Sequence, residues 1–229
     1  MRRISSYLKG MWATDVALTT LLIFLVIYIF FLFPMEQIGS VRLLRNLFFS
    51  LILATGAIAA SKNRAFRALV VSWGILAFVF LLVRHFLPHR ALIFVTTGLS
   101  LIFLVLLSFL ILGQTFREGP TTSHRITGAV AVYLIFGLIW SMAYYLLTLI
   151  IPDAFNIQGA FTPGDTESLQ SYLCYFSFIT LTTLGYGDIV PVHPMARMLV
   201  SLEGVVGQLF PAILIARLVS LHVQGKDKT

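Results

Sequence analysis

The sequence predicts an all-α membrane protein with six membrane-spanning helices. Of its 229 residues, 59% are hydrophobic and only 11% are charged, whereas soluble domains carry about 25% charged residues. The mean hydropathy of the chain is +0.94. In addition, the apolar residues gather in long segments, several of which reach the length of about 20 residues that crosses a bilayer.

The predicted spans follow one another with short connections. The second has the shortest apolar part, although Gly56, Ala57, Ala59 and Ala60 would let a neighbouring helix approach closely. The first is too long for the apolar region of a cleavable signal peptide, so we expect it to remain in the protein. The six spans are residues 14–33, 43–60, 67–86, 91–113, 126–151 and 195–222.

The basic residues predict the orientation of these spans. If the N-terminus is cytoplasmic, more Lys and Arg lie inside than outside, as the positive-inside rule requires. We therefore expect a multi-pass protein of a plasma membrane or bacterial inner membrane, with both termini cytoplasmic and anionic lipid beside the inner cations. The inside group is Arg2, Arg3, Lys9, Lys62, Arg64, Arg67, Arg117, Arg125, Arg217, Lys226 and Lys228, and the outside group is Arg42, Arg45, Arg84, Arg90 and Arg197.

The most informative motif lies between the fifth and sixth spans, after a predicted short helix at 168–181. It reads Thr182-Thr183-Leu184-Gly185-Tyr186-Gly187-Asp188. A loop that strips water from a cation must aim successive backbone carbonyls at one axis, and the required backbone conformations are open to glycine without steric cost. Gly185 and Gly187 supply that freedom.

This motif resembles the selectivity filter of the potassium channel superfamily, with Leu184 in place of the Val of Thr-Val-Gly-Tyr-Gly. Residues 126–222 resemble the superfamily's pore unit: an outer helix, an external loop at 152–167, a re-entrant pore helix at 168–181, the filter and an inner helix. The resemblance implies a potassium-selective channel. Because the chain carries one such loop, it also implies a homotetramer that closes a single pore.

The resemblance assigns the ion-binding role to backbone carbonyls. Those of Thr183, Leu184, Gly185 and Tyr186, with the Thr183 hydroxyl, would replace the hydration shell of K+. We expect no cofactor besides K+ ions in the filter, and no enzyme activity, because no nucleophile and base or paired acids share a common depth. The dispersed basic residues also do not form a nucleic-acid-binding stripe.

Four residues are expected to support the filter from behind: Tyr175, Phe176, Ile179 and Glu203. Tyr186 would pack against pore-helix aromatics, including Phe176 and Phe178, and a brace for Asp188 would depend on the Tyr175 hydroxyl. These aromatics also fit a simpler interpretation as lipid-facing or core residues at helical spacing. For Glu203 the sequence leaves two roles open, a hydrogen bond to the pore helix and attraction of cations.

The inner helix would line the pore below the filter. Gly207 aligns with the superfamily's hinge glycine, and at about 100° per residue a mostly apolar face follows it. Such a face could close the pore by dewetting. His222 could act as a pH-sensitive group or be a solvated residue at the helix end. The predicted pore-lining and hinge residues are Gly207, Gln208, Pro211, Ile215, Val219 and His222.

Residues 1–125 form a four-helix block ahead of the pore domain at 126–229, in the position of a voltage sensor. The fourth helix, 91–113, contains no Lys, Arg, Asp or Glu. Since each charge that crosses the field contributes about 2.3 kcal/mol per 100 mV, we expect weak or absent voltage dependence. Two alternatives stay open, a non-conducting or regulatory subunit of a channel assembly and a weakly selective cation channel.

Overall fold

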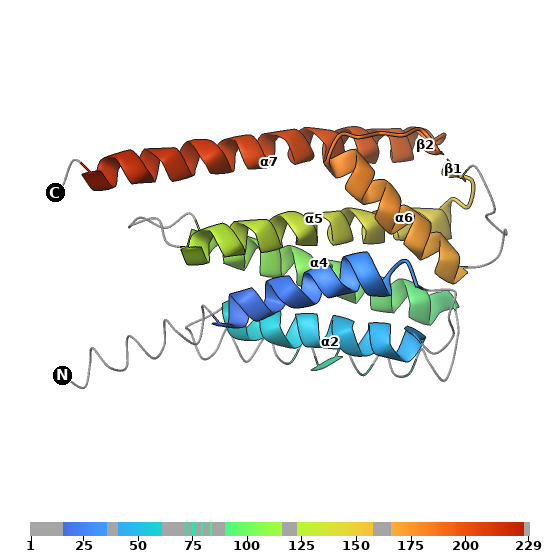
Figure 1. The fold of residues 1–229 in the computed structure, drawn as a ribbon. Helices are drawn as coiled ribbons and strands as arrows, with labels where there is room; N and C mark the ends of the chain where they lie inside the picture. Colours follow the sequence, from blue (N-terminus) through green and yellow to red (C-terminus); the bar gives the residue numbers. More distant parts are fainter. Residues whose placement is uncertain are drawn as a thin grey trace.

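The computed structural model describes residues 16–35, 41–60, 72, 75, 76, 79, 83, 90–115, 123–157 and 166–226. These residues form an elongated bundle of helices with two short strands at one end (Figure 1). The elements are an N-terminal helix (Val16–Leu32) that ends in the π-helix η1 (Tyr28–Leu32), α2 (Val41–Ala60), α4 (Arg90–Thr115), α5 (Ser123–Ile150), β1 (Phe155–Ile157), α6 (Thr166–Leu181), β2 (Ile189–Pro191) and α7 (Pro194–Lys226).

Three helices in the described part of the chain are long and apolar enough to cross a membrane. They cover Arg90–Gly113, Arg125–Ile150 and Pro194–Arg217, with 24, 26 and 24 residues. The N-terminal helix and α2 are shorter apolar helices, and the predicted third span at 67–86 lies almost wholly outside the described residues. The chain is therefore a helical membrane protein, and the total of six spans stays a prediction.

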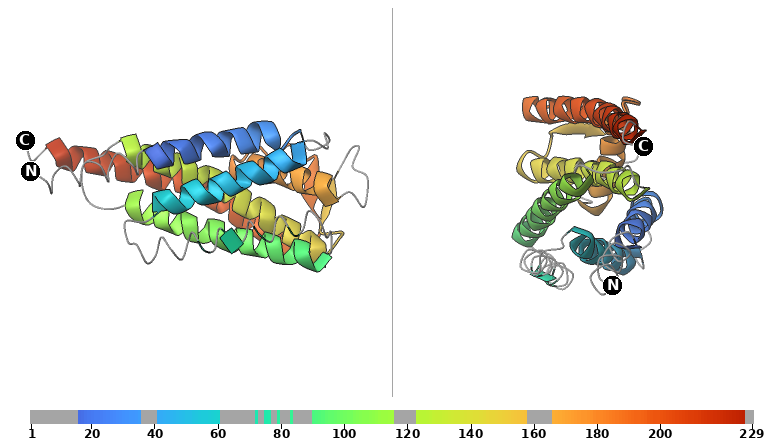
Figure 2. Two further views of the ribbon diagram at one scale, coloured as in Figure 1. Left: turned by 90° about the horizontal axis from the view of Figure 1, so that it is seen from below. Right: turned by 90° about the vertical axis from the view of Figure 1, so that its left-hand side faces the viewer.

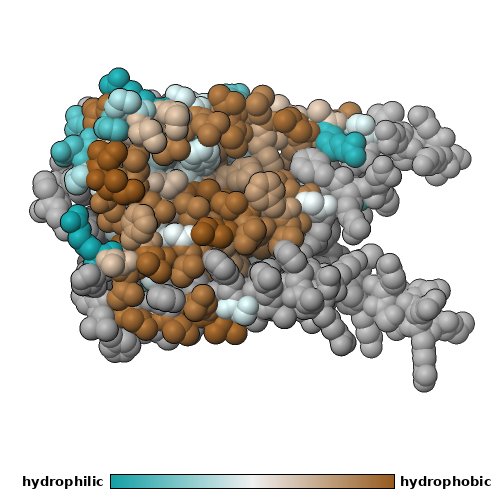
Figure 3. Space-filling model, turned by 180° about the vertical axis from the view of Figure 1, so that it is seen from behind, coloured by the Kyte–Doolittle hydropathy of each residue, from teal (hydrophilic) through white to brown (hydrophobic). Residues whose placement is uncertain are grey.

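The helices are arranged so that α7 lies on one side of the bundle. Figure 2, viewed along the helices, shows α5 and α6 between α7 and the pair formed by the N-terminal helix and α2. A continuous apolar core joins the N-terminal helix, α2, α4 and α5, and Cys174 of α6 belongs to it. One face is broadly hydrophobic along its length, and hydrophilic residues gather at the end where the strands lie (Figure 3). This distribution is the one expected of helices in a bilayer.

Helix α6 does not cross the bundle. It starts at the end where β1 and β2 lie and stops partway along α5 and α7 (Figure 1). From there the chain reverses and returns beside α7 to β2. This arrangement is the re-entrant helix that the sequence predicts at 168–181, with a start two residues earlier.

The two strands join the end of α5 to the segment after the reversal. They pair antiparallel, with Phe155 opposite Pro191 and Ile157 opposite Ile189. The carbonyl oxygen of Ala154 extends the pairing, because it accepts the N–H of Val192 at 2.9 Å and that of His193 at 3.2 Å. The sequence did not predict this pairing between the segment after α5 and the segment that follows the reversal.

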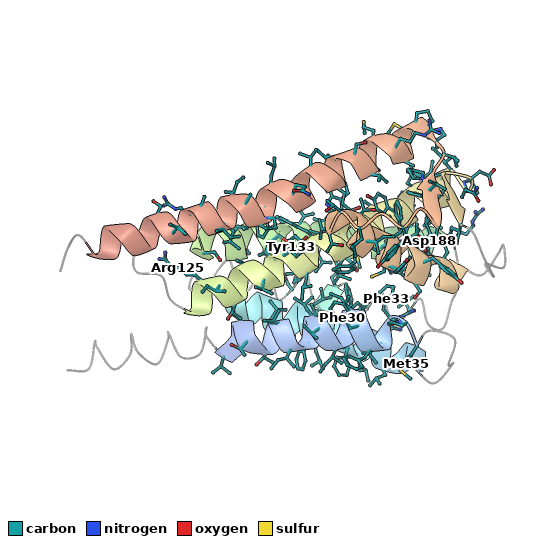
Figure 4. The ribbon with its side chains drawn as sticks, turned by 45° about the horizontal axis from the view of Figure 1, so that its top comes forward. Phe30, Phe33, Met35, Arg125, Tyr133 and Asp188 are labelled. Atoms are coloured by element: carbon teal, nitrogen blue, oxygen red, sulfur yellow. The ribbon has the colours of Figure 1, made fainter. Side chains whose placement is uncertain are left out.

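The N-terminal helix contacts α6 directly at two points. The Ser171 hydroxyl donates to the carbonyl oxygen of Phe33 at 3.0 Å. The rings of Phe30 and Phe178 lie with centroids 6.3 Å apart, and Figure 4 labels Phe30 and Phe33 on this helix. The N-terminal helix and the residue that follows it therefore reach α6.

Helices α5 and α6 approach most closely at Gly137, where a side chain would meet the Phe178 ring. A Cβ atom built there would lie 2.4 Å from Cζ of that ring. We predict that Gly137→Ala lowers the stability of the folded protein by about 1–3 kcal/mol, the usual cost of overpacking. Thermal unfolding in detergent would measure this change.

The matched control is Gly98→Ala on α4, where an added Cβ meets nothing within 4 Å in the described part of the chain. It should leave the unfolding temperature unchanged or raise it, because alanine favours helix. Adding Phe178→Ala to the Gly137 variant should recover part of the loss. Equal unfolding temperatures for Gly137→Ala and the parent protein would contradict the close approach.

Candidate functional site

The segment that follows α6 has an unusual backbone. Thr183, Gly185 and Gly187 have φ angles of +62°, +53° and +79°, while Leu184 and Tyr186 between them do not have positive φ. In an extended chain successive carbonyls point in opposite directions, but a change in the sign of φ at every second residue turns alternate peptide planes. The carbonyl oxygens can then face one side. The sequence predicted this freedom at the two glycines but not at Thr183, which as a β-branched residue rarely adopts positive φ.

Carbonyl groups at the end of α6 hold this backbone in place. The oxygen of Ile179 accepts the N–H of Leu184 at 2.8 Å and that of Gly185 at 3.2 Å. The oxygen of Thr180 accepts the N–H of Thr183 at 2.9 Å. Since these N–H groups point back at the helix, the loop carbonyls are free to face elsewhere. Ile179, predicted as a support residue, contributes through its backbone.

The loop is open to solvent in a single chain. Residues 182–187 are all exposed, and the side chains of Leu184 and Tyr186 are 59% and 68% exposed. At its inner end the amide of Gln208 donates to the Thr183 hydroxyl at 3.3 Å. The Tyr133 hydroxyl of α5 donates to the carbonyl oxygen of Leu181 at 3.1 Å.

Asp188 lies at the end of the loop near the strands (Figure 4), and the Tyr175 phenol is hydrogen-bonded to its carboxylate. The pKa of the Tyr175 phenol is raised above its ordinary value. The largest cause is its partial burial, followed by its hydrogen bond to the Asp188 carboxylate and by the nearby charges of Asp188 and Tyr186. The Asp188 carboxylate also accepts the N–H of Ile189 at 3.1 Å. The structure therefore brings together the two residues that the sequence paired as a brace.

Phe176 does not face the loop as expected. Its ring is buried against Tyr144 of α5 and Phe155 of β1, with centroid distances of 5.6 and 5.5 Å. The reason is helical geometry: Tyr175 is exposed toward the loop, and the next residue turns by about 100° into the packed side of the helix. The expectation that Phe176 packs directly against Tyr186 is corrected on these contacts.

Glu203 of α7 is fully buried between helices. One of its carboxyl oxygens accepts the hydroxyl of Tyr144 from α5, and the other lies within hydrogen-bond distance of the Ser177 hydroxyl from α6. Of the two interpretations left open, contact with the pore helix is the one that agrees with this geometry. Sequence reasoning missed Ser177 and Tyr144, because nothing in their local pattern marks them as partners of a residue in another helix.

The predicted pore-lining residues lie along one continuous helix. Pro211 stands inside α7, which runs unbroken from Pro194 to Lys226. Gln208, Ile215 and Val219 are exposed, whereas the side chain of His222 lies outside the described residues.

Gly207 has a role that alignment with a hinge did not predict. A Cβ atom at this position would lie 2.1 Å from the carbonyl oxygen of Leu181, so only glycine lets α7 pass the end of α6.

Comparisons with known proteins agree with this geometry. A family model described as "Ion channel" matches residues 129–224, from α5 through the loop to α7. The chain is 30% identical over 94 residues to Protein LctB of Bacillus caldotenax, a match that covers 35% of this chain and 69% of LctB. The chain belongs to the potassium channel superfamily.

A second relative matches over a similar length of the chain. The chain is 32% identical over 88 residues to the inward rectifier potassium channel Kirbac3.1 of Paramagnetospirillum magnetotacticum. That match covers 38% of this chain and spans about a quarter (26%) of Kirbac3.1. No solved structure matches the chain at the same level of significance. These relationships make the protein a channel and not an enzyme.

We predict that Tyr175→Phe destabilises the loop 182–188, and with it the open state of a channel built on this loop, because the Asp188 carboxylate loses its phenolic partner. A hydrogen bond contributes about 1 kcal/mol net, so the open-state lifetime should fall roughly five-fold. Single-channel recording in planar bilayers would measure it. Thr20→Ala is the control, since that hydroxyl donates to the Val16 carbonyl of its own helix. Equal lifetimes for Tyr175→Phe and this control would argue against the brace.

Proposed function

We propose that four copies of this chain form a potassium-selective channel and that each copy contributes one filter loop. The observation that supports this best is the alternation of positive φ at Thr183, Gly185 and Gly187. Together with N–H groups that bond to the pore helix, it leaves a row of carbonyl oxygens available on one side. Such a row is what a dehydrated cation needs.

In the proposed filter, K+ is held by the carbonyls of Thr183, Leu184, Gly185 and Tyr186 and by the Thr183 hydroxyl. Four copies of each oxygen form successive rings that replace the water around the ion. Because backbone carbonyls are neutral dipoles, binding is strong enough for entry but still permits release to the next ring. The amide of Gln208, hydrogen-bonded to the Thr183 hydroxyl, fixes the lowest ring.

Assembly is supported by the surfaces that a single chain leaves uncovered. Only 11% of the apolar stretch of the α7 span is buried inside the chain, whereas 44% and 50% of the corresponding stretches of α4 and α5 are buried. The exposed Leu184 and Tyr186 side chains at the filter are also apolar or aromatic. With one loop in each chain, a four-fold filter requires four chains.

We predict that the purified protein has the mass of four chains of 25.6 kDa each. Native mass spectrometry from detergent micelles would measure it. Because the proposed interface includes the outer face of α7, replacing the exposed Leu202 with Glu should shift the population toward smaller assemblies. A parent protein that is monomeric in both detergent and lipid nanodiscs would contradict the four-fold filter.

Gating is proposed to depend on the pore itself. Helix α4 carries no Lys or Arg after Arg90 at its start, so the block ahead of the pore is expected to respond weakly to voltage. Below the filter the inner helix offers the face of Pro211, Ile215, Val219 and His222, which is mostly apolar and would close by dewetting. In this proposal both termini are cytoplasmic, in a plasma or bacterial inner membrane.

We predict that the purified protein in liposomes carries K+ and Rb+ but not Na+. Gly185→Asp should abolish this flux, because a side chain at φ +53° is strained and would displace a carbonyl ring. A fluorescence flux assay with each cation in turn measures both results. Gly98→Ala, which meets nothing within 4 Å, serves as the matched glycine control.

The same assay separates the alternatives. Equal K+ and Na+ flux would favour a weakly selective cation channel. No flux from a correctly assembled tetramer would favour a non-conducting or regulatory subunit. Flux that persists in Gly185→Asp would remove the filter from the proposal.

A further inference from the structure

The buried carboxyl group of Glu203 joins the three helices that surround the filter. Its Oε2 accepts the Tyr144 hydroxyl of α5, and its Oε1 lies 2.5 Å from the Ser177 Oγ of α6. The same Ser177 Oγ lies 2.8 Å from the carbonyl oxygen of Gly137 on α5. Glu203 and Ser177 are both 0% exposed, so water does not reach these groups in the structure.

The number of protons in this cluster is informative. A serine hydroxyl has one proton to donate, and a backbone carbonyl can only accept. If Glu203 were ionised, the single Ser177 proton would have to serve both the carboxylate and the Gly137 carbonyl, and one contact would lack a donor. If Glu203 is protonated, its O–H donates to Ser177 and Ser177 donates to Gly137. Tyr144 then donates to Oε2, and every contact has a donor.

The surroundings of Glu203 also disfavour a charge. Its two hydrogen-bond partners are neutral hydroxyls. The titratable groups that face it within the described structure are the phenols of Tyr144 and Tyr133, both on α5. From α6 it is faced by Ser177, which does not titrate. An ionised carboxylate buried among helices without a cation is costly.

We propose that Glu203 carries a proton in the folded channel, and that this protonated carboxyl group is a positioning residue for the selectivity filter. Ser177 lies two residues before Ile179, whose carbonyl oxygen holds the N–H groups of Leu184 and Gly185. The link through Ser177 to Gly137 therefore fixes the end of α6 against α5. Loss of the Glu203 proton turns the Ser177 hydroxyl toward the carboxylate and releases Gly137.

The first test is infrared spectroscopy of the assembled protein in lipid, with the parent protein and Glu203→Gln as probes. A protonated carboxyl group gives a C=O stretch at higher frequency than carboxylate bands. We expect this band in the parent protein at neutral pH and its loss in Glu203→Gln, whose amide can still donate to Ser177 and accept from Tyr144. A parent spectrum without a band that the substitution removes would overturn the proposal.

The second test uses K+ flux as a function of pH and rests on the proposed channel function. Parent flux should fall as the pH is raised, because Glu203 ionises, whereas Glu203→Gln should keep the neutral-pH flux and lose the alkaline fall. Ser177→Ala should lower flux several-fold at all pH values. Ser141→Ala is the matched control, since that buried hydroxyl of α5 has no hydrogen-bond partner among the residues that the structure describes.

The two tests fail in different ways. Absence of flux from the parent protein would count against channel function, but the infrared band needs no conduction and would still decide the protonation of Glu203. A Glu203→Gln variant with the same alkaline fall as the parent would overturn the positioning role. So would a Ser177→Ala variant with the same flux and pH profile as Ser141→Ala.

Discussion

The carbonyl oxygen of Ile179 is the contact on which the filter loop depends. It accepts the N–H groups of both Leu184 and Gly185, at a point where α6 is ending and its last carbonyls lack partners within the helix. The N–H groups of the loop thus supply a hydrogen-bond partner for a carbonyl group at the end of the helix, and these bonds fix the direction of the loop. Since the C-terminal end of a helix carries partial negative charge, the same arrangement favours a cation nearby.

Different elements hold the two ends of this loop. At the outer end, the Tyr175–Asp188 pair and the pairing of β1 with β2 connect it to the pore helix and to the end of α5. At the inner end, Tyr133 and Gln208 reach the loop from α5 and α7. A residue such as Thr183 keeps a strained backbone conformation only where the surrounding structure fixes it. The contacts at the two ends of the loop fix it here.

The sequence predicted the elements whose signals are local. The re-entrant helix was expected at 168–181 and is observed at Thr166–Leu181, and the outer and inner helices begin within three residues of their predicted starts. Long apolar segments and the glycine motif carry that information. The strands β1 and β2 could not be predicted, because three-residue pairs have no periodic signal and form only after the chain reverses.

Side-chain partners between helices were harder to predict. Glu203 was marked as unusual because an acid in an apolar helix stands out, but its partner Ser177 looks like any small helical residue. Phe176 was assigned to the filter as one of the pore-helix aromatics, whereas in the structure its ring packs on Tyr144 and Phe155. The partner of each of these side chains depends on which faces of α5 and α6 meet. No short stretch of the sequence shows how those faces meet.

The contact between Gly207 and the Leu181 carbonyl has a mechanical consequence. The position that aligns with a hinge in the inner helix is also the point where this helix touches the last turn of the pore helix. A bend at Gly207 would sweep α7 across that carbonyl, which the Tyr133 hydroxyl also holds. The proposed gate and the proposed ion-binding loop would therefore be joined at one contact, and we expect movement of α7 there to change the position of the loop.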